Sequence, residues 1–551
     1  MTPLAQSVWR RVCLTISFLS SAQFQKSANE PTVVRIVGTD LSYQDKLKLF
    51  SQQQPKIFDW FPKVLAAHSC CFSNITMNAV EKVMLIELPS ELYGDILCRW
   101  SDLKSLVKMD SAACNHKIRP ALLQLFASNH CVFSSTVNLT GKCTVDWMRS
   151  RKLKLSYLCL GAYFPELVTY IRSHSQSIRH VTCTASKAVH LVGLYIRNLV
   201  TLTFRKIEVP EISDFLYLNP NLQELRLEGL SDISVQCFEN LTLPHLQLLS
   251  LHNSTCDDTV LEIVVRMTER LQYVEIGKCK LVTDVGAIAV AQHCPQLRSL
   301  GLRALSISDG ALLQLTQLCP CITSLDLFDN DVVTDLGVRA IAENLRNLNQ
   351  ISISHCIKLT DASLEHLTHY NSSTLQELRT LGLPTVRVDV LVTLLQKCSH
   401  LHTISLGCDL DVYHAEIIPY MHNLQTLVTY AVLSDDALYT IAHHCKQLQR
   451  LGIYSMYSYV KPVDTVLITT SDSRVMHYAD KFTDFKGRVY TEKGLLALLD
   501  GLPHLRVLAV QEKEVQQGLL MPLAQSLWRR VCPKISFEVD YGYFSFDCLL
   551  K

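Results

Sequence analysis

The sequence reads LQYVEIGKC from Leu271, LRSLGLRAL from Leu297, ITSLDLFDN from Ile322 and LNQISISHC from Leu348. Each copy carries apolar residues at its first, fourth and sixth places, and three copies end with Cys or Asn at the ninth place. Side chains of a strand alternate between its two faces, so the fourth and sixth places face one core while the third, fifth and seventh face away from it. The phrase therefore predicts a series of short, half-buried strands.

A second phrase lies between these strands. It reads LVTDVGAIAVAQHC at 281–294, SISDGALLQLTQLC at 306–319, VVTDLGVRAIAENL at 332–345 and KLTDASLEHLTHY at 358–370. Apolar residues recur in it at intervals of three and four, as on one face of a helix. An Asp stands at each expected helix N-cap: Asp284, Asp309, Asp335 and Asp361. Each unit is therefore one strand followed by one helix.

The two phrases resemble the Cys-containing leucine-rich repeats of the F-box/leucine-rich-repeat protein family. Extending the first phrase outwards places first-position apolar residues from Leu155 to Leu505, and most steps fall within the repeat's usual length. The step from Leu348 to Leu378 is 30 residues, and the step from Leu448 to Leu505 is 57. The resemblance implies an α/β fold over residues 150–540, a right-handed leucine-rich-repeat solenoid with a parallel concave sheet and outer helices in a horseshoe.

Composition narrows the class of protein. The chain has 551 residues, of which 48% are hydrophobic and 19% charged, and its formal net charge is +1. Because this balance gives no basic field, nucleic-acid binding is not expected. No apolar run reaches the length of a membrane span, so no membrane association is expected either.

The 21 cysteines are predicted to be structural. Six of them recur at repeat-periodic positions that suit a small buried side chain, namely Cys279, Cys294, Cys319, Cys356, Cys398 and Cys445. No set of Cys and His residues has metal-ligand spacing, so neither a metal nor a cofactor is predicted. Scattered core thiols favour a reducing compartment, and a cytoplasmic or nuclear location is expected.

Residues 1–18, MTPLAQSVWRRVCLTISF, nearly repeat the segment MPLAQSLWRRVCPKISF at 521–537. At the second place the segment can pack on the last repeat, with Ile535–Phe537 adding a closing strand. The first copy has no preceding repeat to contact, and we interpret it as the duplicated tail of an upstream tandem paralogue. A signal peptide is the alternative. Residues 1–80 as a whole are predicted to be poorly structured.

Residues 85–126 predict a compact group of helices, with Pro89 at a helix start and two apolar stripes after it. The segment resembles the F-box, which in that family binds the adaptor of a cullin-based ubiquitin ligase. The resemblance assigns adaptor binding to Leu88, Pro89, Leu92, Ile96, Leu97, Leu103 and Leu106. The alternative is a plain helical cap on the first repeat, which every solenoid of this kind needs.

The long step between Leu448 and Leu505 predicts one repeat with an insertion at about residues 455–490, followed by a helix at 491–499. Long loops inside compact architectures are usually functional or disordered. The insertion contains several aromatic residues. Its place beside the concave sheet favours a functional loop.

No catalytic motif is present in the sequence, so a non-catalytic binding protein is expected rather than an enzyme. The outward-facing strand positions from Gly301 to Gly452 are mostly small and predict a half-enclosed cleft, with Gly382 as one of them. Arg226 is expected to lie outside it. Exposed aromatic and arginine side chains commonly anchor protein interfaces. The predicted partner-binding residues are Phe328, Tyr430, Arg450, Tyr454, Arg303 and Asp326.

Two functions follow. The first is the substrate-recognition subunit of an SCF-type cullin E3 ubiquitin ligase, which binds its protein target on the concave face of the repeats. The alternative is a leucine-rich-repeat interaction scaffold without ligase function, whose helical segment is only a cap. Recovery of an adaptor and a cullin with the purified protein would separate the two.

Overall fold

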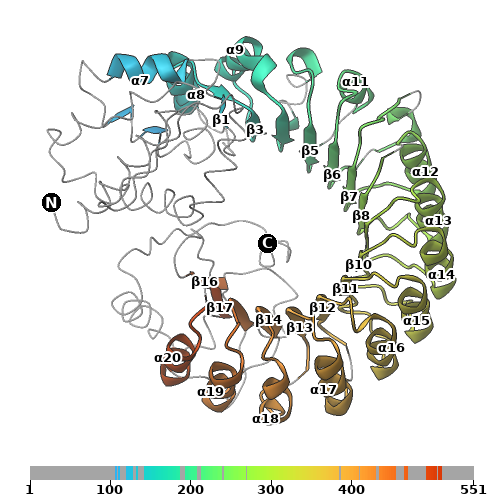
Figure 1. Ribbon diagram of the computed structural model, residues 1–551. Helices are drawn as coiled ribbons and strands as arrows, with labels where there is room; N and C mark the ends of the chain where they lie inside the picture. The colour runs from blue at the N-terminus through green and yellow to red at the C-terminus, as the bar shows by residue number, and fades with distance from the viewer. Residues whose placement is uncertain are drawn as a thin grey trace, which may run out of the picture. The chain divides into compact units, whose positions relative to one another are not determined.

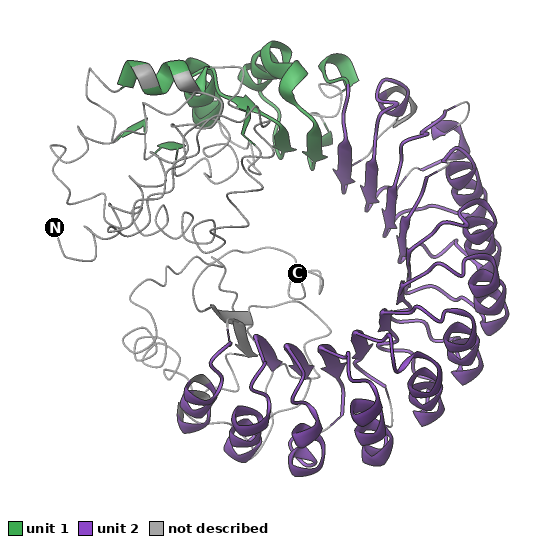
Figure 2. Cartoon of the chain, in the orientation of Figure 1, with its two compact units in different colours: residues 1–197 green, residues 198–551 purple. Residues whose placement is uncertain are grey.

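The computed structural model divides into two compact units, residues 1–197 and 198–551. The residues that it describes are 106–107, 110–111, 119–127, 132–133, 142–186, 193–207, 212–231, 233–238, 241–268, 270–383, 386–408, 410–429, 433–453, 465–469, 492–505 and 507–511. Figure 2 draws the two units in green and purple.

Among the elements of the first unit that lie in the described part are three α-helices, one 3-10 helix and short parallel strands. The elements are α7 (Arg119–Phe126), β1 (Val132–Phe133), α8 (Lys142–Ser150), β2 (Lys154–Leu155), β3 (Tyr157–Leu160), α9 (Pro165–His174), η3 (Ser175–Ser177) and β4 (His180–Cys183). Strand β1 pairs with β2 and β3 pairs with β4, both in parallel. The fully buried rings of Phe126 and Phe133 meet edge to face at 6.1 Å, which joins α7 to β1.

The second unit is built around parallel strands that pair in chain order. They are β5 (Thr201–Arg205), β6 (Glu224–Glu228), β7 (Leu248–His252), β8 (Tyr273–Gly277), β9 (Ser299–Arg303), β10 (Ser324–Asp326), β11 (Gln350–Ser352), β12 (Glu377–Thr380), β13 (Thr403–Leu406), β14 (Thr426–Thr429) and β15 (Arg450–Ile453). Strand β17 (Val507–Gln511) pairs next, in parallel with β15.

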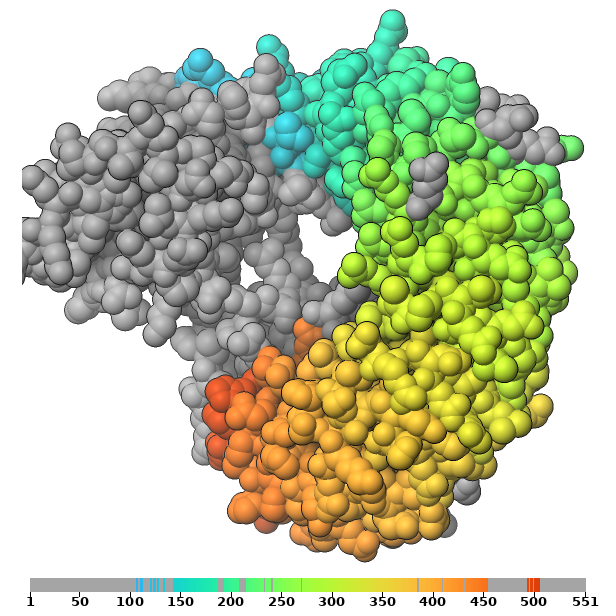
Figure 3. All heavy atoms as spheres, turned by 45° about the vertical axis from the view of Figure 1, so that its right-hand side comes forward, coloured from blue at the N-terminus to red at the C-terminus, as the bar shows by residue number. Residues whose placement is uncertain are grey.

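Helices lie outside these strands. They are α11 (Ile212–Tyr217), η4 (Val235–Cys237), α12 (Asp258–Arg266), α13 (Asp284–His293), α14 (Asp309–Leu318), α15 (Asp335–Asn344), α16 (Asp361–Asn371), α17 (Val388–Lys397), α18 (His414–Ile417), η5 (Ile418–Tyr420), α19 (Asp435–His444) and α20 (Glu492–Gly501). Figure 1 shows the strands of this unit on its inner side and the helices on its outer side. In Figure 3 the colours from green to orange follow one another in chain order, so each repeat packs on its neighbours.

The predicted leucine-rich-repeat solenoid is confirmed by this arrangement. First-, fourth- and sixth-place residues form a continuous core; Leu271, Val274 and Ile276, for example, are all at most 2% exposed. The strands expected at 156–160, 200–204, 223–227, 298–302, 323–327 and 349–353 are all present, each beginning one residue later. Burial of this apolar row is the main favourable term for such a stack.

The helix N-caps differ from the prediction by one residue. Thr283, Ser308, Thr334 and Thr360 are the caps, and their hydroxyl groups accept hydrogen bonds from the first-turn N–H groups at 3.3 Å. The aspartates that were expected to cap their own helices instead occupy the first helical position. Their carboxylates reach the next repeat, where Asp309 accepts from the N–H and the hydroxyl of Thr334 at 2.9 and 2.6 Å.

This contact recurs along the stack, and we call it the aspartate ladder. Asp258 bonds to Thr283, Asp284 to Ser308, Asp309 to Thr334, and Asp335 to Thr360. Where a glycine follows in the next helix, its missing side chain leaves room for the carboxylate. A Cβ atom on Gly337 would lie 2.4 Å from an oxygen of Asp309, and one on Gly286 would lie equally close to Asp258.

The eighth place of the repeat is a tight turn in the left-handed region. Lys206, Gly229, Asn253, Lys278, Ala304, Asp329, His355 and Gly382 all have φ between 49° and 69°. The N–H of this residue donates to a carbonyl of the next repeat, as from Lys278 to Arg303 at 2.8 Å. The turn therefore links neighbouring repeats as well as ending each strand.

Gly382 identifies an error in the predicted register. Leu378 pairs with Ile351 and Ile404, which are fourth-place residues, so Leu378 is itself a fourth-place residue. The first place of this repeat belongs to the buried Leu375. Gly382 consequently lies in the eighth-place turn, and the outward-facing fifth place is taken by Arg379.

The last strand of the sheet comes from the predicted insertion. Strand β16 (Thr465–Thr469) pairs antiparallel with β17 (Val507–Gln511), on the side away from β15. Strand β16 therefore occupies the edge of β17 that faces away from β15. Ile535–Phe537, like residues 1–80, lies outside the described residues. The helix expected at 491–499 is present as α20.

The repeat-periodic cysteines are buried core thiols, as predicted. The Cys356 thiol donates to the carbonyl of Leu327 at 3.1 Å, and that of Cys319 to the carbonyl of Cys294 at 3.3 Å. Burial raises the pKa of the Cys294, Cys356 and Cys445 thiols to about 12. These groups are therefore protonated and poor nucleophiles at neutral pH.

Candidate functional site on the inner face of the sheet

A hollow of about 460 Å³ lies on the inner face of the second unit, and we call it the central hollow. It extends from β6 to β12. Its lining consists of outward-facing strand residues with the strand backbones beneath them. The polar and charged members are Arg226, Tyr273, Glu275, Ser299, Arg303, Ser324, Asp326, Gln350, Ser352, Glu377 and Arg379.

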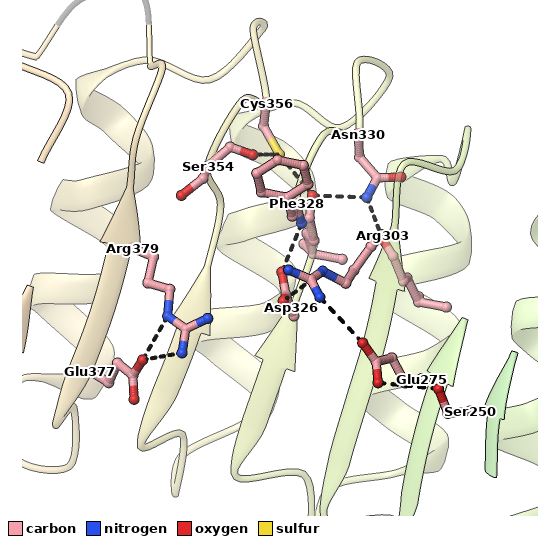
Figure 4. A network of polar contacts seen from close by, with 12 residues as sticks. Ser250, Glu275, Arg303, Asp326, Phe328, Asn330, Ser354, Cys356, Glu377 and Arg379 are labelled. Carbon is pink, nitrogen blue, oxygen red and sulfur yellow. Dashed lines mark hydrogen bonds and ion pairs between the residues drawn. The ribbon is translucent and has the colours of Figure 1, made fainter. Parts of the chain in front are cut away.

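An ion-pair cluster occupies the middle of the hollow. Arg303 on β9 donates to a carboxylate oxygen of Glu275 on β8 at 3.3 Å, and its Nε lies 3.2 Å from a carboxylate oxygen of Asp326 on β10. Figure 4 shows both carboxylates directed toward the guanidinium. Glu275 also accepts from the Ser250 hydroxyl at 3.3 Å. The Arg303 cluster, made of Glu275, Arg303 and Asp326, thus holds two negative charges and one positive charge.

The strand register explains how the cluster forms. Glu275, Gly301 and Asp326 occupy the same place of three adjacent strands. Gly301 has no side chain, and Glu275 leans over it, with its Cγ 3.2 Å from where a Cβ atom of Gly301 would stand. The small residue therefore makes room for a neighbouring carboxylate rather than leaving the floor bare.

Phe328 borders the cluster. The Arg303 guanidinium lies 5.5 Å from the centre of the Phe328 ring, and the centre of the His355 ring lies 5.2 Å from the same point. The backbone N–H of Phe328 donates to Asp326 at 3.0 Å. Phe328 is therefore half-buried and fixed by its neighbours, so a partner would meet a prearranged ring.

The other arginines of the inner face are paired as well. Arg379 donates through Nε to Glu377 at 2.6 Å and also contacts it through Nη2. Arg226 lies 3.4 Å from Glu224, and Arg205 lies 2.9 Å from Glu228. These contacts leave the inner face with alternating, mutually compensated charges.

Two histidines near the site are uncharged at neutral pH. Burial lowers the pKa of His252, against the opposing effect of the Glu275 charge. Burial likewise lowers the pKa of His355. Neither ring therefore adds positive charge to the hollow at pH 7.

The open part of the inner face differs in place from the predicted cleft. Third-place residues Tyr273 and Gln350 are exposed, whereas Thr403 on β13 and Thr426 on β14 are buried, at 7% and 9% exposure. The hollow therefore lies over β6–β12 and not over Gly301–Gly452 as a whole. Arg226, which was expected outside the cleft, lines the hollow.

The predicted partner-binding residues are only partly brought together. Arg303 and Asp326 line the hollow and Phe328 borders it, while Arg450 lies on β15, beyond the hollow's lining. Tyr430 and Tyr454 lie outside the described residues. Glu377 and Arg379 were missed because the sequence TLQELRTLGL allows two frames. With Leu375 as the first place, the steps from the preceding repeat and to the next one are 27 and 26 residues, which are more even than the 30 and 23 given by Leu378. This frame assigns Glu377 and Arg379 to the outward-facing positions.

Of the residues assigned to adaptor binding, only Leu106 is described, and it is buried within the chain at 1% exposure. Leu88, Pro89, Leu92, Ile96, Leu97 and Leu103 lie outside the described residues. Close by, the buried carboxylate of Asp110 accepts from Arg151 at 2.8 Å and from the Trp147 indole at 3.3 Å. This contact ties the segment around residue 110 to α8, just before the first repeat.

The described residues contain no group of three or more His, Cys, Asp or Glu side chains placed to hold a metal ion. None of the helices in the described part of the chain has the length and apolar character that a membrane crossing requires.

Comparison with known proteins supports the assignment of the repeats. Residues 235–374 match the family model described as FBD-associated F-box protein, LRR repeats. F-box/LRR-repeat protein 4 of Bos taurus is 28% identical over 154 residues, which are 27% of this chain and 25% of that protein. Antagonist of mitotic exit network protein 1 of Eremothecium gossypii is 32% identical over 128 residues, 22% of this chain and 32% of that protein.

The matched segment thus spans only a quarter to a third of these relatives. A solved structure of Rad7 and Elc1 in yeast aligns with a TM-score of 0.37 and 13% identity, covering 67% of this chain and 94% of that one. This similarity is too low to inform function. The sequence matches agree with the repeat phrases and their strand register. They confirm that the chain resembles the F-box/leucine-rich-repeat family through its repeats.

Proposed function

We propose that this chain is the substrate-recognition subunit of an SCF-type cullin ubiquitin ligase and binds a target protein on the inner face of its repeats. The observation that carries the proposal is the central hollow, a prearranged polar surface on repeats that match those of F-box proteins. Its ring and ion pairs are already fixed by mutual contacts, which lowers the entropy lost on binding. The chain itself contributes binding and not catalysis.

Residues 85–126 supply the link to the ligase in this proposal. Their resemblance to the F-box places adaptor contacts on the apolar edge around Leu88, Pro89, Leu92 and Ile96. The same resemblance assigns Leu97, Leu103 and Leu106 to adaptor binding. A ligase receptor needs both parts, one for the adaptor and one for the target.

The test is co-purification from cells. The tagged full chain is expected to recover an adaptor and a cullin together with target proteins. The double variant Leu88→Ala, Pro89→Ala is expected to lose the adaptor and the cullin while it still recovers the targets. Conversely, Arg303→Ala with Phe328→Ala is expected to lose targets and retain the adaptor.

A scaffold without ligase function is the second candidate, and one observation favours it. Leu106 and Phe126 are buried, and Asp110 accepts a hydrogen bond from Trp147 of α8, so the described end of the segment also serves as a cap on the first repeats. If the parent chain recovers targets without any adaptor or cullin, the scaffold function replaces the ligase function.

A further inference from the structure

The charges of the central hollow are unequally exposed. The Arg303 side chain is 14% exposed, whereas those of Glu275 and Asp326 are 33% and 22% exposed. The two carboxylates therefore stand nearer to solvent than the guanidinium that they share. A ligand at the Arg303 cluster would meet one negative charge in excess, whereas the lining as a whole is balanced, because it also holds Arg226, Arg379 and Glu377.

A phosphate group is expected to bind weakly to the arginines Arg303 and Arg379 of the hollow. Arg303 is shared by two carboxylates, and Arg379 is held by Glu377 through two of its nitrogens. An incoming phosphate would have to displace these carboxylates or lie beside them. Leaving a carboxylate without its partner in a half-buried place is costly, and like charges repel.

A basic side chain is expected to bind favourably beside Tyr273 and Glu275. Tyr273 is 45% exposed and stands two residues before Glu275 on β8, so both side chains project from the same face of the sheet. The face of an aromatic ring attracts a cation, and a neighbouring carboxylate attracts the same cation by its negative charge. The neighbouring Ser324 and Gln350 are bonded to each other at 3.1 Å and add no competing charge.

We propose that the central hollow selects a protein segment that presents a lysine or arginine and carries no phosphate, with the basic side chain docking between Tyr273 and the carboxylates of Glu275 and Asp326. This inference rests on the proposed function and specifies its substrate class. Phosphorylation next to the docked residue would release the segment, because the added charge would face Glu275 and Asp326.

The experiment uses the full chain and a phage-displayed library of random 12-residue peptides. Peptides selected on the parent chain are expected to be enriched in lysine and arginine. One selected peptide is then synthesised in three forms: unchanged, with norleucine replacing its basic residue, and with phosphoserine beside that residue. Fluorescence anisotropy is expected to show both altered forms binding roughly tenfold more weakly. The norleucine form loses a charge-assisted hydrogen bond, and the phosphoserine form brings a negative charge to face Glu275 and Asp326.

Two variants locate the effect. Glu275→Gln is expected to reduce the preference for the basic peptide over its norleucine form by about tenfold. Arg303 keeps Asp326 as a partner, so the cluster is expected to remain folded. The matched control is Glu262→Gln on α12, which also removes a carboxylate paired with an arginine, at 3.8 Å from Arg266. The control is expected to bind like the parent chain.

The proposal is overturned if selection yields no basic peptides, if the norleucine form binds as tightly, or if the phosphorylated form binds best. It is also overturned if Glu275→Gln and Glu262→Gln behave alike. Adaptor recovery through Leu88 and Pro89 is measured separately. A chain that recovers adaptor and cullin but shows no preference for basic peptides would retain the ligase function and lose only this inference.

Discussion

The aspartate ladder and the central hollow use charged residues in opposite ways. In the ladder four successive aspartates make the same contact, from the carboxylate to the Ser or Thr at the start of the next helix. In the hollow each strand contributes something different: Tyr273 and Glu275 from β8, Gly301 and Arg303 from β9, Asp326 from β10. The difference teaches that repetition maintains the stack, while departures from it shape the binding surface.

Substitutions in the ladder are therefore expected to change stability, and substitutions in the hollow to change binding. Nearest-neighbour contacts dominate the energetics of a solenoid, so a defect in one ladder contact weakens the interface between two repeats.

The largest effect is expected at Gly337. Gly337→Ala places a Cβ atom 2.4 Å from an oxygen of Asp309 and 3.0 Å from Leu312, so the free energy of unfolding should fall by about 1–3 kcal/mol. Urea denaturation followed by circular dichroism measures this. Gly310→Ala is the control, because a Cβ atom there meets only the Ser308 hydroxyl at 3.7 Å. It should be neutral or stabilising by up to about 1 kcal/mol, and an equal loss in both variants would contradict the ladder.

A smaller, pH-dependent effect is expected at Asp335. Burial alone would raise the pKa of Asp335, but hydrogen bonds from Ser363 and Thr360 outweigh it and leave the pKa lowered. A lowered folded-state pKa stabilises the fold above the unfolded value of about 3.9, and this stability is lost as the pH falls through the folded-state value. Asp335→Asn should cost about 1 kcal/mol at pH 7. The difference in free energy of unfolding between variant and parent should disappear below about pH 4. A difference that does not depend on pH would show that the negative charge of Asp335 is not what stabilises the fold.

Relief of the eighth-place turn should give a still smaller change, and in the opposite direction. Lys278 holds φ at 53°, a conformation that costs a non-glycine residue about 1–2 kcal/mol. Lys278→Gly removes that cost but raises the entropy of the unfolded chain, so a net gain of about 0.5 kcal/mol is expected. Thermal melting of this variant beside Gly229→Ala, which should be destabilised, tests the point. Destabilisation by both changes would show that the Lys278 side chain matters more than its backbone.

The smallest stability change is expected in the hollow. Tyr273 is exposed and takes no part in the aspartate ladder. Tyr273→Ala should therefore alter the free energy of unfolding by less than about 0.5 kcal/mol. The same variant should bind the selected basic peptide several-fold more weakly. A large loss of stability with unchanged peptide binding would reverse the comparison between the two regions.

The sequence predicted the repeating part of this protein well because periodic burial leaves a periodic pattern of letters. Leu271, Val274 and Ile276 could be assigned to the core from spacing alone, and so could the strand positions within one residue. The prediction that the aspartates cap their own helices was wrong for a physical reason. Asp and Ser or Thr are both good N-caps, and nothing local in Thr334-Asp335 indicates that the second residue bonds to the next repeat instead of its own helix.

The binding surface was less predictable because it depends on contacts between different repeats. Gly301 suggested an open floor, but the side chain that fills the space is Glu275 from the preceding strand. Arg379 was hidden by the ambiguous frame at Leu375 and Leu378. The buried state of Thr403 and Thr426 leaves no trace in the repeat pattern.

The antiparallel pairing of β16 with β17 also bears on the order in which the chain can acquire structure during synthesis. From β5 to β15 each strand pairs with the one made just before it, so this part can assemble as it emerges from the ribosome. Strand β16 cannot follow that sequence. It is made before β17 and pairs with the edge of β17 away from β15, so it cannot pair until residues 507–511 have been synthesised. Folding of the second unit is therefore expected to finish with a delayed step that a ribosome stalled before Val507 would prevent.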